Sequence, residues 1–175
     1  MAKTYPAIGP FAPGDILTAA TMTNIDTNLE NQRVPSMCIT TAVNTSQSLT
    51  NASFVGVEFT GADAVDTDAM HNPASNPSRF TINTAGVYVV EFYLVINSTA
   101  VVSAVVALGK NGAGVSENGT GSPISASAMR MSVGAIIEAA AGDYIEPLVY
   151  QASSPAAARN PFTGRMSLAW LGQVS

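Results

Sequence analysis

The stretch RFTINTAGVYVVEFYLVIN, residues 79–97, decides the fold that this sequence predicts. Branched and aromatic residues dominate it, which favours a short strand ending at Ile82, a turn over residues 83–86, and a long strand from Val87 to Ile96. Side chains alternate between the two faces of a strand. One face therefore carries only apolar side chains, those of Tyr88, Val90, Phe92, Leu94 and Ile96, and the other carries Val87, Val89, Glu91, Tyr93 and Val95.

Both faces of the long strand are largely apolar, so each needs cover. A strand of an ordinary antiparallel sandwich packs one face on the core and leaves the other in water. At about 25 cal/mol per Å², leaving side chains such as Val87 and Tyr93 in water would forgo several kcal/mol. The cover could be a second sheet of the same chain or a neighbouring subunit. We predict a subunit interface formed by Val87, Val89, Glu91, Tyr93 and Val95.

Glu91 is the acidic exception on this face. Burying a carboxylate without a partner would cost several kcal/mol, so we expect a cation beside it. Arg79 and Arg130 are the candidates, either within the chain or from another subunit. The alternative is that Glu91 lies at a solvated rim.

The composition indicates one domain with an appendage, in a chain that buries much of its surface in an assembly. Of the 175 residues, 47% are hydrophobic and only 11% are charged, which argues against an isolated, highly soluble monomer. The net charge of −5 disfavours nucleic acid as a partner, because that binding depends on Lys and Arg. Polar residues interrupt the apolar region at residues 85–109, which favours strands over a membrane span.

Cys38 is the only cysteine, so a disulfide within the chain is excluded. In an apolar strand this residue is expected to be a small core residue rather than a reactive thiol. The N-terminal sequence MAKTYPAIGPF has no apolar segment of signal-peptide length. Secretion is therefore not expected.

Residues 1–33 predict an N-terminal anchor that begins with an extended arm. Prolines alternate with Tyr5, Ile8 and Phe11 over residues 1–14, and proline favours a semi-rigid extended chain over a helix. The apolar residues are unlike those of a disordered tail. We expect this arm to insert into a partner; a flap packed on its own domain is the alternative.

A short helix is expected to follow the arm. Thr18 can cap a helix over residues 19–32, and Met22, Ile25 and Leu29 recur on one stripe of it. So narrow a stripe suits a short coiled-coil bundle or a groove in a partner. The alternative is a helix that lies on its own domain.

Strand and turn signals alternate over residues 34–175, the predicted head domain. Further strands are expected at residues 37–43, 52–59, 101–108, 124–133, 136–139, 144–150 and 164–172, with Phe54, Val57 and Phe59 supplying core contacts. Asn111 and Gly112 predict a tight hairpin turn. Short strands joined by Gly, Asn and Pro turns indicate an all-β antiparallel sandwich, or jelly roll.

The segments that carry a family resemblance are VEFTGADAVDTDAMHNP, the stretch quoted above, LGKNG, AAGDYIEPLVYQ and RMSLAWLG. Their order and spacing, over about residues 34–174, resemble the trimeric jelly-roll heads of the complement and tumour necrosis factor-like superfamily, in the versions found in bacteria and phages. The resemblance implies a homotrimer associated around the long strands. It also matches recurrent fold positions of the family to Phe80, Gly86, Tyr88, Gly142 and Asp143. Upstream, LTAATMTNIDTNLEN resembles N-terminal segments of phage fibre and appendage proteins.

The sequence offers little catalytic chemistry. His71, the only histidine, lies near Asp66 and Asp68, and these three are weak candidates for a calcium site. Calcium needs six or more oxygen ligands, and loops rich in Asp and Asn are usually turns. A Gly-x-Ser-x-Gly elbow and a Gly-Lys-Ser/Thr phosphate loop are both absent. We therefore expect neither an enzyme nor a metal or other cofactor.

Together these features predict a structural protein of the bacteriophage virion, made in the host cytoplasm. Its trimeric head would decorate the capsid or end a head fibre, and residues 1–33 would bind other virion proteins. A tail-associated fibre that binds a host receptor or surface glycan is the first alternative. It is disfavoured because the loops carry mostly small polar residues and no long shaft separates anchor from head. A bacterial lectin-like module is the second alternative.

Overall fold

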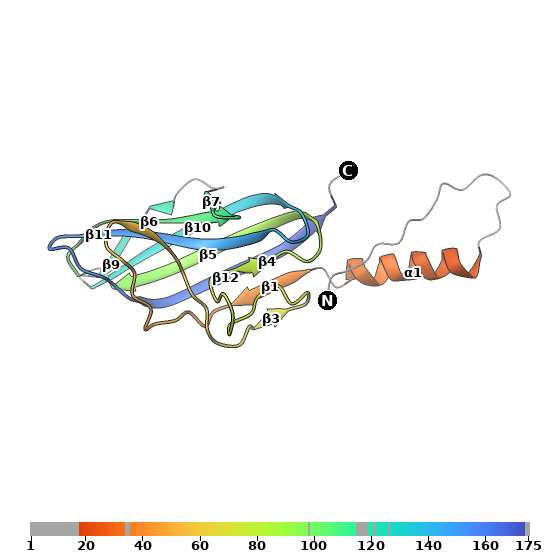
Figure 1. Cartoon of the computed structure of the whole chain (residues 1–175), viewed down its shortest axis with the longest axis horizontal. Helices are drawn as coiled ribbons and strands as arrows, with labels where there is room; N and C mark the ends of the chain where they lie inside the picture. Colours follow the sequence, from red (N-terminus) through yellow and green to blue (C-terminus); the bar gives the residue numbers. More distant parts are fainter. Residues whose placement is uncertain are drawn as a thin grey trace.

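The computed structural model describes residues 18–33, 36–97, 99–114, 119–120, 122–125 and 127–173, which form one helix and two antiparallel sheets (Figure 1). In chain order the elements are α1 (Ala19–Arg33), β1 (Met37–Thr40), β2 (Ser53–Gly56), β3 (Val65–Asp66), β4 (Phe80–Thr81), β5 (Gly86–Asn97), β6 (Val101–Lys110), β7 (Ala113–Gly114), β8 (Gly119–Thr120), β9 (Ser122–Ser125), β10 (Ala128–Ala139), β11 (Tyr144–Ser153) and β12 (Pro161–Gly172). The sheets are layered against each other, which confirms the predicted all-β antiparallel sandwich.

β5, the strand that the quoted stretch predicts, lies in the middle of the larger sheet. The strand order of that sheet is β3-β1-β12-β5-β10-β9. β10 pairs with β5 along its whole length, from Ala128 opposite Asn97 to Ala139 opposite Gly86, and β12 pairs with its other edge. The smaller sheet has the order β4-β11-β6-β7, with β8 also paired to β6. Both edges of β5 are thus hydrogen-bonded, and only its two faces remain to be covered.

The inner face of β5 is the centre of the core. Its apolar side chains are buried as predicted, each at most 1% exposed: Tyr88, Val90, Phe92, Leu94 and Ile96. The smaller sheet contributes Val106 and Leu108 from β6 and Val149 from β11. The Tyr88 hydroxyl would be costly to bury without a partner, and it donates a hydrogen bond to the Thr84 backbone oxygen.

Residues 124–133 and 136–139, predicted as two strands, are largely one. β10 runs without a break from Ala128 to Ala139, and the residues before it form the separate short strand β9. Gly134 weakens the strand pattern in the sequence, yet in the sheet it is held opposite Glu91 by pairing with β5. The tertiary ladder therefore overrides the local propensity of this glycine.

Phe54 was predicted in the core and instead lies outside it. It is 50% exposed, whereas Val57 and Phe59 are fully buried as expected. Side chains alternate along an extended chain, so residue 54 points away from the side that residues 57 and 59 share. The Phe54 ring contacts the Tyr150 ring, with centroids 5.5 Å apart, on the outer side of β11.

The predicted helix is α1, and it does not lie on the sandwich. Thr18 caps it, since its Oγ1 accepts a hydrogen bond of 3.2 Å from the Thr21 backbone N–H. Figure 1 shows α1 beyond the end of the sandwich at which β1 begins, and the core includes none of the helix side chains that the structure describes, those of residues 19–29. Met22 and Leu29 are 58% and 55% exposed. The alternative of a helix packed on its own domain is therefore wrong.

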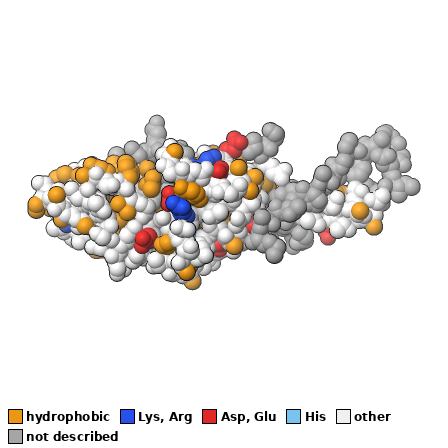
Figure 2. Space-filling view, viewed as in Figure 1, with side chains coloured by type: hydrophobic (Ala, Val, Ile, Leu, Met, Phe, Trp, Pro, Cys, Tyr) orange, Lys and Arg blue, Asp and Glu red, His pale blue; other side chains and the backbone are white. Residues whose placement is uncertain are grey.

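None of the described helical residues form a segment with the length and apolarity that crossing a membrane requires. The surface of the sandwich is uneven in character. Figure 2 shows hydrophobic side chains gathered over the end of the sandwich away from α1, with a few charged side chains near the middle of the molecule.

Candidate functional site

The candidate site is the outer face of the six-stranded sheet, turned away from the core. Strand pairing brings side chains of β10, β5 and β12 together on it, because residues directly opposite each other in a ladder share a face. Tyr93 of β5 lies opposite Ser132 of β10 and Arg165 of β12. One step along the face, Glu91 lies opposite Gly134 and Ser167. We call this surface the outer face below.

The predicted interface residues of β5 all lie on this face, but their side chains differ in solvent exposure. Val87, Val89 and Tyr93 are half-buried, and Glu91 is exposed. Val95 is only 5% exposed within the single chain, and its place in a subunit interface stays a prediction. It lies opposite Thr163, where a bulge adds an extra residue to β12 and crowds this end of β5.

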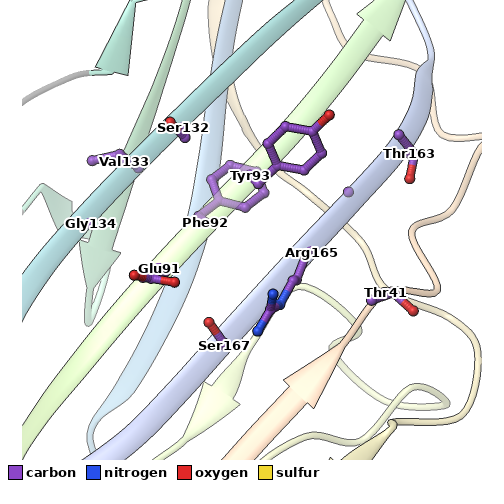
Figure 3. Close-up of a pocket in the computed structure, with 11 residues that line it drawn as sticks. Thr41, Glu91, Phe92, Tyr93, Ser132, Val133, Gly134, Thr163, Arg165 and Ser167 are labelled. Carbon is purple, nitrogen blue, oxygen red and sulfur yellow. The ribbon is translucent and has the colours of Figure 1, made fainter.

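A depression of about 680 Å³ occupies the middle of the outer face. Its walls come from β5, β10 and β12 and from the residue that follows β1: Thr41, Glu91, Phe92, Tyr93, Ser132, Val133, Gly134, Thr163, Gly164, Arg165 and Ser167. Figure 3 shows Glu91 and Tyr93 on one strand, with the Arg165 guanidinium reaching from the neighbouring strand toward Ser167. Gly134, which lies opposite Glu91, leaves part of the floor open because it carries no side chain.

The two cations predicted as partners of Glu91 are engaged elsewhere. Arg79 Nε donates to Glu146 Oε1 at 3.1 Å on the smaller sheet, and its guanidinium lies 4.3 Å from the Tyr144 ring centroid. Arg130 is on the outer face, but its guanidinium lies 5.8 Å from the Tyr93 ring centroid. Glu91 itself is exposed in the middle of the face, rather than at its rim.

Two residues of the outer face were missed by the sequence reasoning. Ile136 of β10 is 72% exposed and lies opposite Val89, so it extends the apolar part of the face. Arg165 of β12 lies opposite Tyr93. Alternation along residues 164–172 could have placed Arg165 on the side away from Met166 and Leu168. For Ile136 the register with β5 was needed, and a single sequence does not supply it.

The weak metal candidates use their polar atoms to shape the loop at residues 61–77. The Asp66 carboxylate accepts backbone hydrogen bonds from Asp68, Met70 and His71, at 3.3, 2.9 and 3.0 Å. His71 Nδ1 lies 2.8 Å from Asp63 Oδ1. Its Nε2 donates to the Pro77 backbone oxygen at 3.1 Å. The His71 ring also stacks on Phe80, which fixes the loop to β4.

Asp68 is fully buried and joins three parts of the chain. Its Oδ2 accepts hydrogen bonds from Ser36 Oγ at 3.0 Å and from Thr84 Oγ1 at 2.8 Å. Asp66, Asp68 and His71 thus act in the structure as cross-links between a loop and its strands.

Cys38 lies with Asp63 and Asp66 in a group whose potential ligand atoms are within 4.8 Å of one another. Burial and the two carboxylates raise the pKa of the Cys38 thiol well above its ordinary value. Cys38 is a fully buried core residue, as predicted.

Of the six predicted anchor residues, Tyr5, Ile8 and Phe11 lie outside the described residues. The other three, Met22, Ile25 and Leu29, line one side of α1 with Thr23 and Asp26. The helix therefore carries an apolar stripe, and none of the core residues that the structure describes belongs to this helix.

No protein-family model matches the sequence, and no curated protein matches it. Solved structures do. The globular domain of zebrafish complement 1qA protein has a TM-score of 0.57 and 13% identity, over 81% of this chain and 100% of that domain. Murine APRIL has a TM-score of 0.51 and 11% identity, over 77% of this chain and 99% of that one. The described chain therefore has the two-sheet antiparallel sandwich of C1q and tumour necrosis factor-like domains, with one short helix before it.

Proposed function

We propose that this chain is a non-enzymatic structural protein of a bacteriophage virion: a homotrimeric head that decorates the capsid or ends a head fibre, held to the particle by residues 1–33. The observation that carries the proposal is the outer face. Its central strand is already paired at both edges, yet Val87 and Val89 of that strand remain only half-buried, and Ile136, opposite Val89 on β10, is exposed. Such a face is typical of a surface that another subunit covers.

Self-association into a closed ring is the simplest way to cover the face. Most soluble oligomers are symmetric assemblies of one chain, and a closed ring covers the apolar patch of every subunit. Three copies are favoured over two by the resemblance to trimeric jelly-roll heads. A trimer would also bring three α1 helices to one end of the assembly, where the stripe of Met22, Ile25 and Leu29 suits a short bundle.

The hydrogen bonds of His71 and the burial of Cys38 support a structural role. Both ring nitrogens of His71 are within hydrogen-bond distance of protein oxygens, and the Cys38 thiol is buried with a raised pKa. Neither is placed to activate a substrate, because a general base or nucleophile must reach the atom that it attacks.

A second candidate function, binding to the host surface from the phage tail, is favoured by one observation. Phe54 and Phe162 are about half exposed, and Phe54 pairs with Tyr150. Exposed aromatic rings are common in recognition surfaces. Particles that lack this protein distinguish the two placements: a tail-tip receptor binder predicts lost adsorption to the host, whereas capsid decoration predicts normal adsorption.

The oligomeric state and its dependence on the outer face test the head assignment. We expect the full chain to have the mass of a trimer by light scattering coupled to gel filtration. Val89→Asp should convert it to a folded monomer, because a charge would then face the apolar part of the interface. The loss expected is at least 2 kcal/mol for each subunit boundary.

Val102→Asp is the matched control. Val102 is 71% exposed on β6, in the other sheet, so the same substitution there should leave the trimer intact. A monomeric wild-type chain, or a Val89→Asp variant that remains trimeric, would contradict the proposal.

A further inference from the structure

We propose that Glu91 of one subunit pairs with Arg165 of the next, and that this ion pair at each boundary selects the partner and the register of the trimer. The inference rests on the proposed function, since it requires that another copy covers the outer face. It deepens that function by naming the residues that make self-association specific.

Glu91 cannot be left out of an interface that covers its apolar neighbours. It follows Val89 on the same face, about 7 Å further along β5, and Ile136 lies opposite Val89 on the adjacent strand. Any surface that covers Val89 and Ile136 therefore reaches the Glu91 carboxylate, which is exposed in the single chain. Removing that carboxylate from water is unfavourable unless a cation meets it.

Arg165 is the cation that the outer face offers. It is exposed, and the next side chain on the same face of β12 is that of Ser167. Ser167 lies opposite Glu91. Figure 3 shows its guanidinium reaching toward Ser167. In the part of the chain that the structure describes, the ion pairs join His71 to Asp63, Arg79 to Glu146 and Lys110 to Asp143, so that neither Glu91 nor Arg165 takes part in one.

Arg130 is the other arginine on the same face, but it is differently placed. Its guanidinium lies 5.8 Å from the Tyr93 ring centroid, a cation–π contact within the subunit. Arg165 has no such aromatic partner among the ring contacts of the described residues. A planar guanidinium also matches a carboxylate with two parallel hydrogen bonds, which fixes orientation as well as charge.

The symmetry of a closed ring allows these two residues to meet from different subunits. In a ring of three, each boundary joins two different patches of the same chain. A face that carries an unpaired acid on β5 and an unpaired base on the neighbouring strand β12 can offer its acid to one boundary and its base to the other. Each boundary can then bring Glu91 of one subunit against Arg165 of its neighbour.

Charge reversal tests this pairing in the full chain. The variants are E91R, R165E and the double variant E91R/R165E, together with an equimolar mixture of E91R and R165E refolded from urea. Trimer formation is measured by gel filtration with light scattering, and folding of each variant by circular dichroism. Because both side chains are exposed in the single chain, the substitutions are expected to leave the sandwich folded.

We expect each single variant to weaken trimer formation about a hundredfold or more at each boundary. The double variant should restore it. The mixture should also restore it in part, because a ring of two E91R chains and one R165E chain has two matched boundaries and one mismatched boundary. This last result depends on a pair that crosses the boundary.

The other outcomes overturn the inference in distinguishable ways. Single variants that remain trimeric would show that the two charges do not matter. Rescue by the double variant without rescue by the mixture would place the pair within one subunit, and rescue by neither would mean that the residues do not pair. A monomeric wild-type chain would instead overturn the proposed function itself.

Arg79 and Glu146 provide the matched controls. They form an ion pair of 3.1 Å on the smaller sheet, away from the outer face. R79E and E146R make the same charge changes as R165E and E91R and should leave the trimer intact. Loss of the trimer in these controls would mean that net charge, rather than a specific ion pair, controls trimer formation. That result would overturn the proposed pairing.

Discussion

Gly86 begins β5 in a conformation that few other residues adopt. Its φ is +150°, and a Cβ added there would lie 2.1 Å from Trp170 Nε1 and 2.3 Å from the Gly172 backbone oxygen. Trp170 cannot move aside easily, because its indole N–H donates to the Ala85 backbone oxygen at 3.1 Å. This glycine therefore permits the close approach of β12 to the start of β5.

We expect Gly86→Ala to lower the free energy of unfolding by about 3 kcal/mol, from backbone strain and from the clash together. Urea unfolding followed by tryptophan fluorescence measures it. Gly142→Ala is the control, since Gly142 has a φ of +94° but no atom within 4 Å of the added Cβ. It should cost only about 1 kcal/mol. Equal losses in the two variants would mean that the contact with Trp170 is unimportant.

The Cys38 thiol should be unreactive in the native protein. Its pKa is raised, first by burial and then by the charges of Asp66 and Asp63, so the thiolate needed for reaction is scarce. At pH 8 a chromogenic disulfide reagent should label the protein only as fast as the chain unfolds. Rapid labelling of the folded protein, with no dependence on urea, would contradict the burial of this residue.

The same pKa change affects stability in alkaline solution. The unfolded chain can ionise its thiol near the ordinary value of 9.0, whereas the folded chain cannot. The stability that the protonated thiol maintains is therefore complete below that pH and declines above it. Cys38→Ala removes this contribution and serves as the control for both measurements.

At the scale of elements, two turns are joined through one side chain. Asp143 Oδ1 accepts a hydrogen bond of 2.7 Å from Asn111 Nδ2, and its Oδ2 accepts one of 2.8 Å from the Ala140 backbone N–H. Lys110 Nζ lies 3.3 Å from Oδ2. Asp143 thereby ties the β10–β11 turn to the hairpin after β6.

These contacts give Asp143 a pH dependence with a defined sign. The hydrogen bonds from Asn111 and Ala140, and then Lys110, lower the pKa of the Asp143 carboxyl below its ordinary 3.8. Its stabilising effect is thus present above that value and lost as pH falls through the lowered pKa. Asp143→Asn should lower the free energy of unfolding by about 1 kcal/mol at pH 7, because the site is solvent-screened. The difference should shrink toward pH 2; an unchanged difference would contradict this role.

The helices, strands and turns could be predicted where a single segment of sequence carries the whole pattern. β5 has alternating branched and aromatic residues along its length, and Asn111 and Gly112 take the positive φ values, 53° and 81°, that a tight hairpin requires. The prediction divided β10 into two strands on either side of Gly134, a residue with a low strand propensity. Pairing with β5 holds that segment extended, and this information lies in another part of the chain.

The candidate site was predictable in part for the same reason. The alternation of β5 alone places Val87, Val89, Glu91 and Tyr93 on one face. Ile136 and Arg165 join them only through strand pairing. The partners expected for Glu91 were chosen by charge along the sequence, whereas the fold places Arg79 on the other sheet beside Glu146.

At the scale of the whole molecule, the sandwich and the helix are separable. Among the described residues, the core contains no side chain of α1, so we expect a chain beginning at Val34 to fold. We expect deletion of residues 1–33 to leave a folded, trimeric head that no longer joins phage particles, because the proposed anchor is gone. Gel filtration and immunoblotting of purified particles measure the two effects. Particles that still carry the truncated protein would contradict the anchor assignment.

The two ends of the sandwich differ in what they carry. β1 begins beside the last part of β12, since Met37 pairs with Ala169, and α1 lies off this same end (Figure 1). The connection from β5 to β6, through Thr99 and Ala100, lies at the opposite end. In the proposed assembly, a foreign peptide grafted into that connection would be carried away from the proposed attachment point, which would make the chain a scaffold for multivalent antigen display.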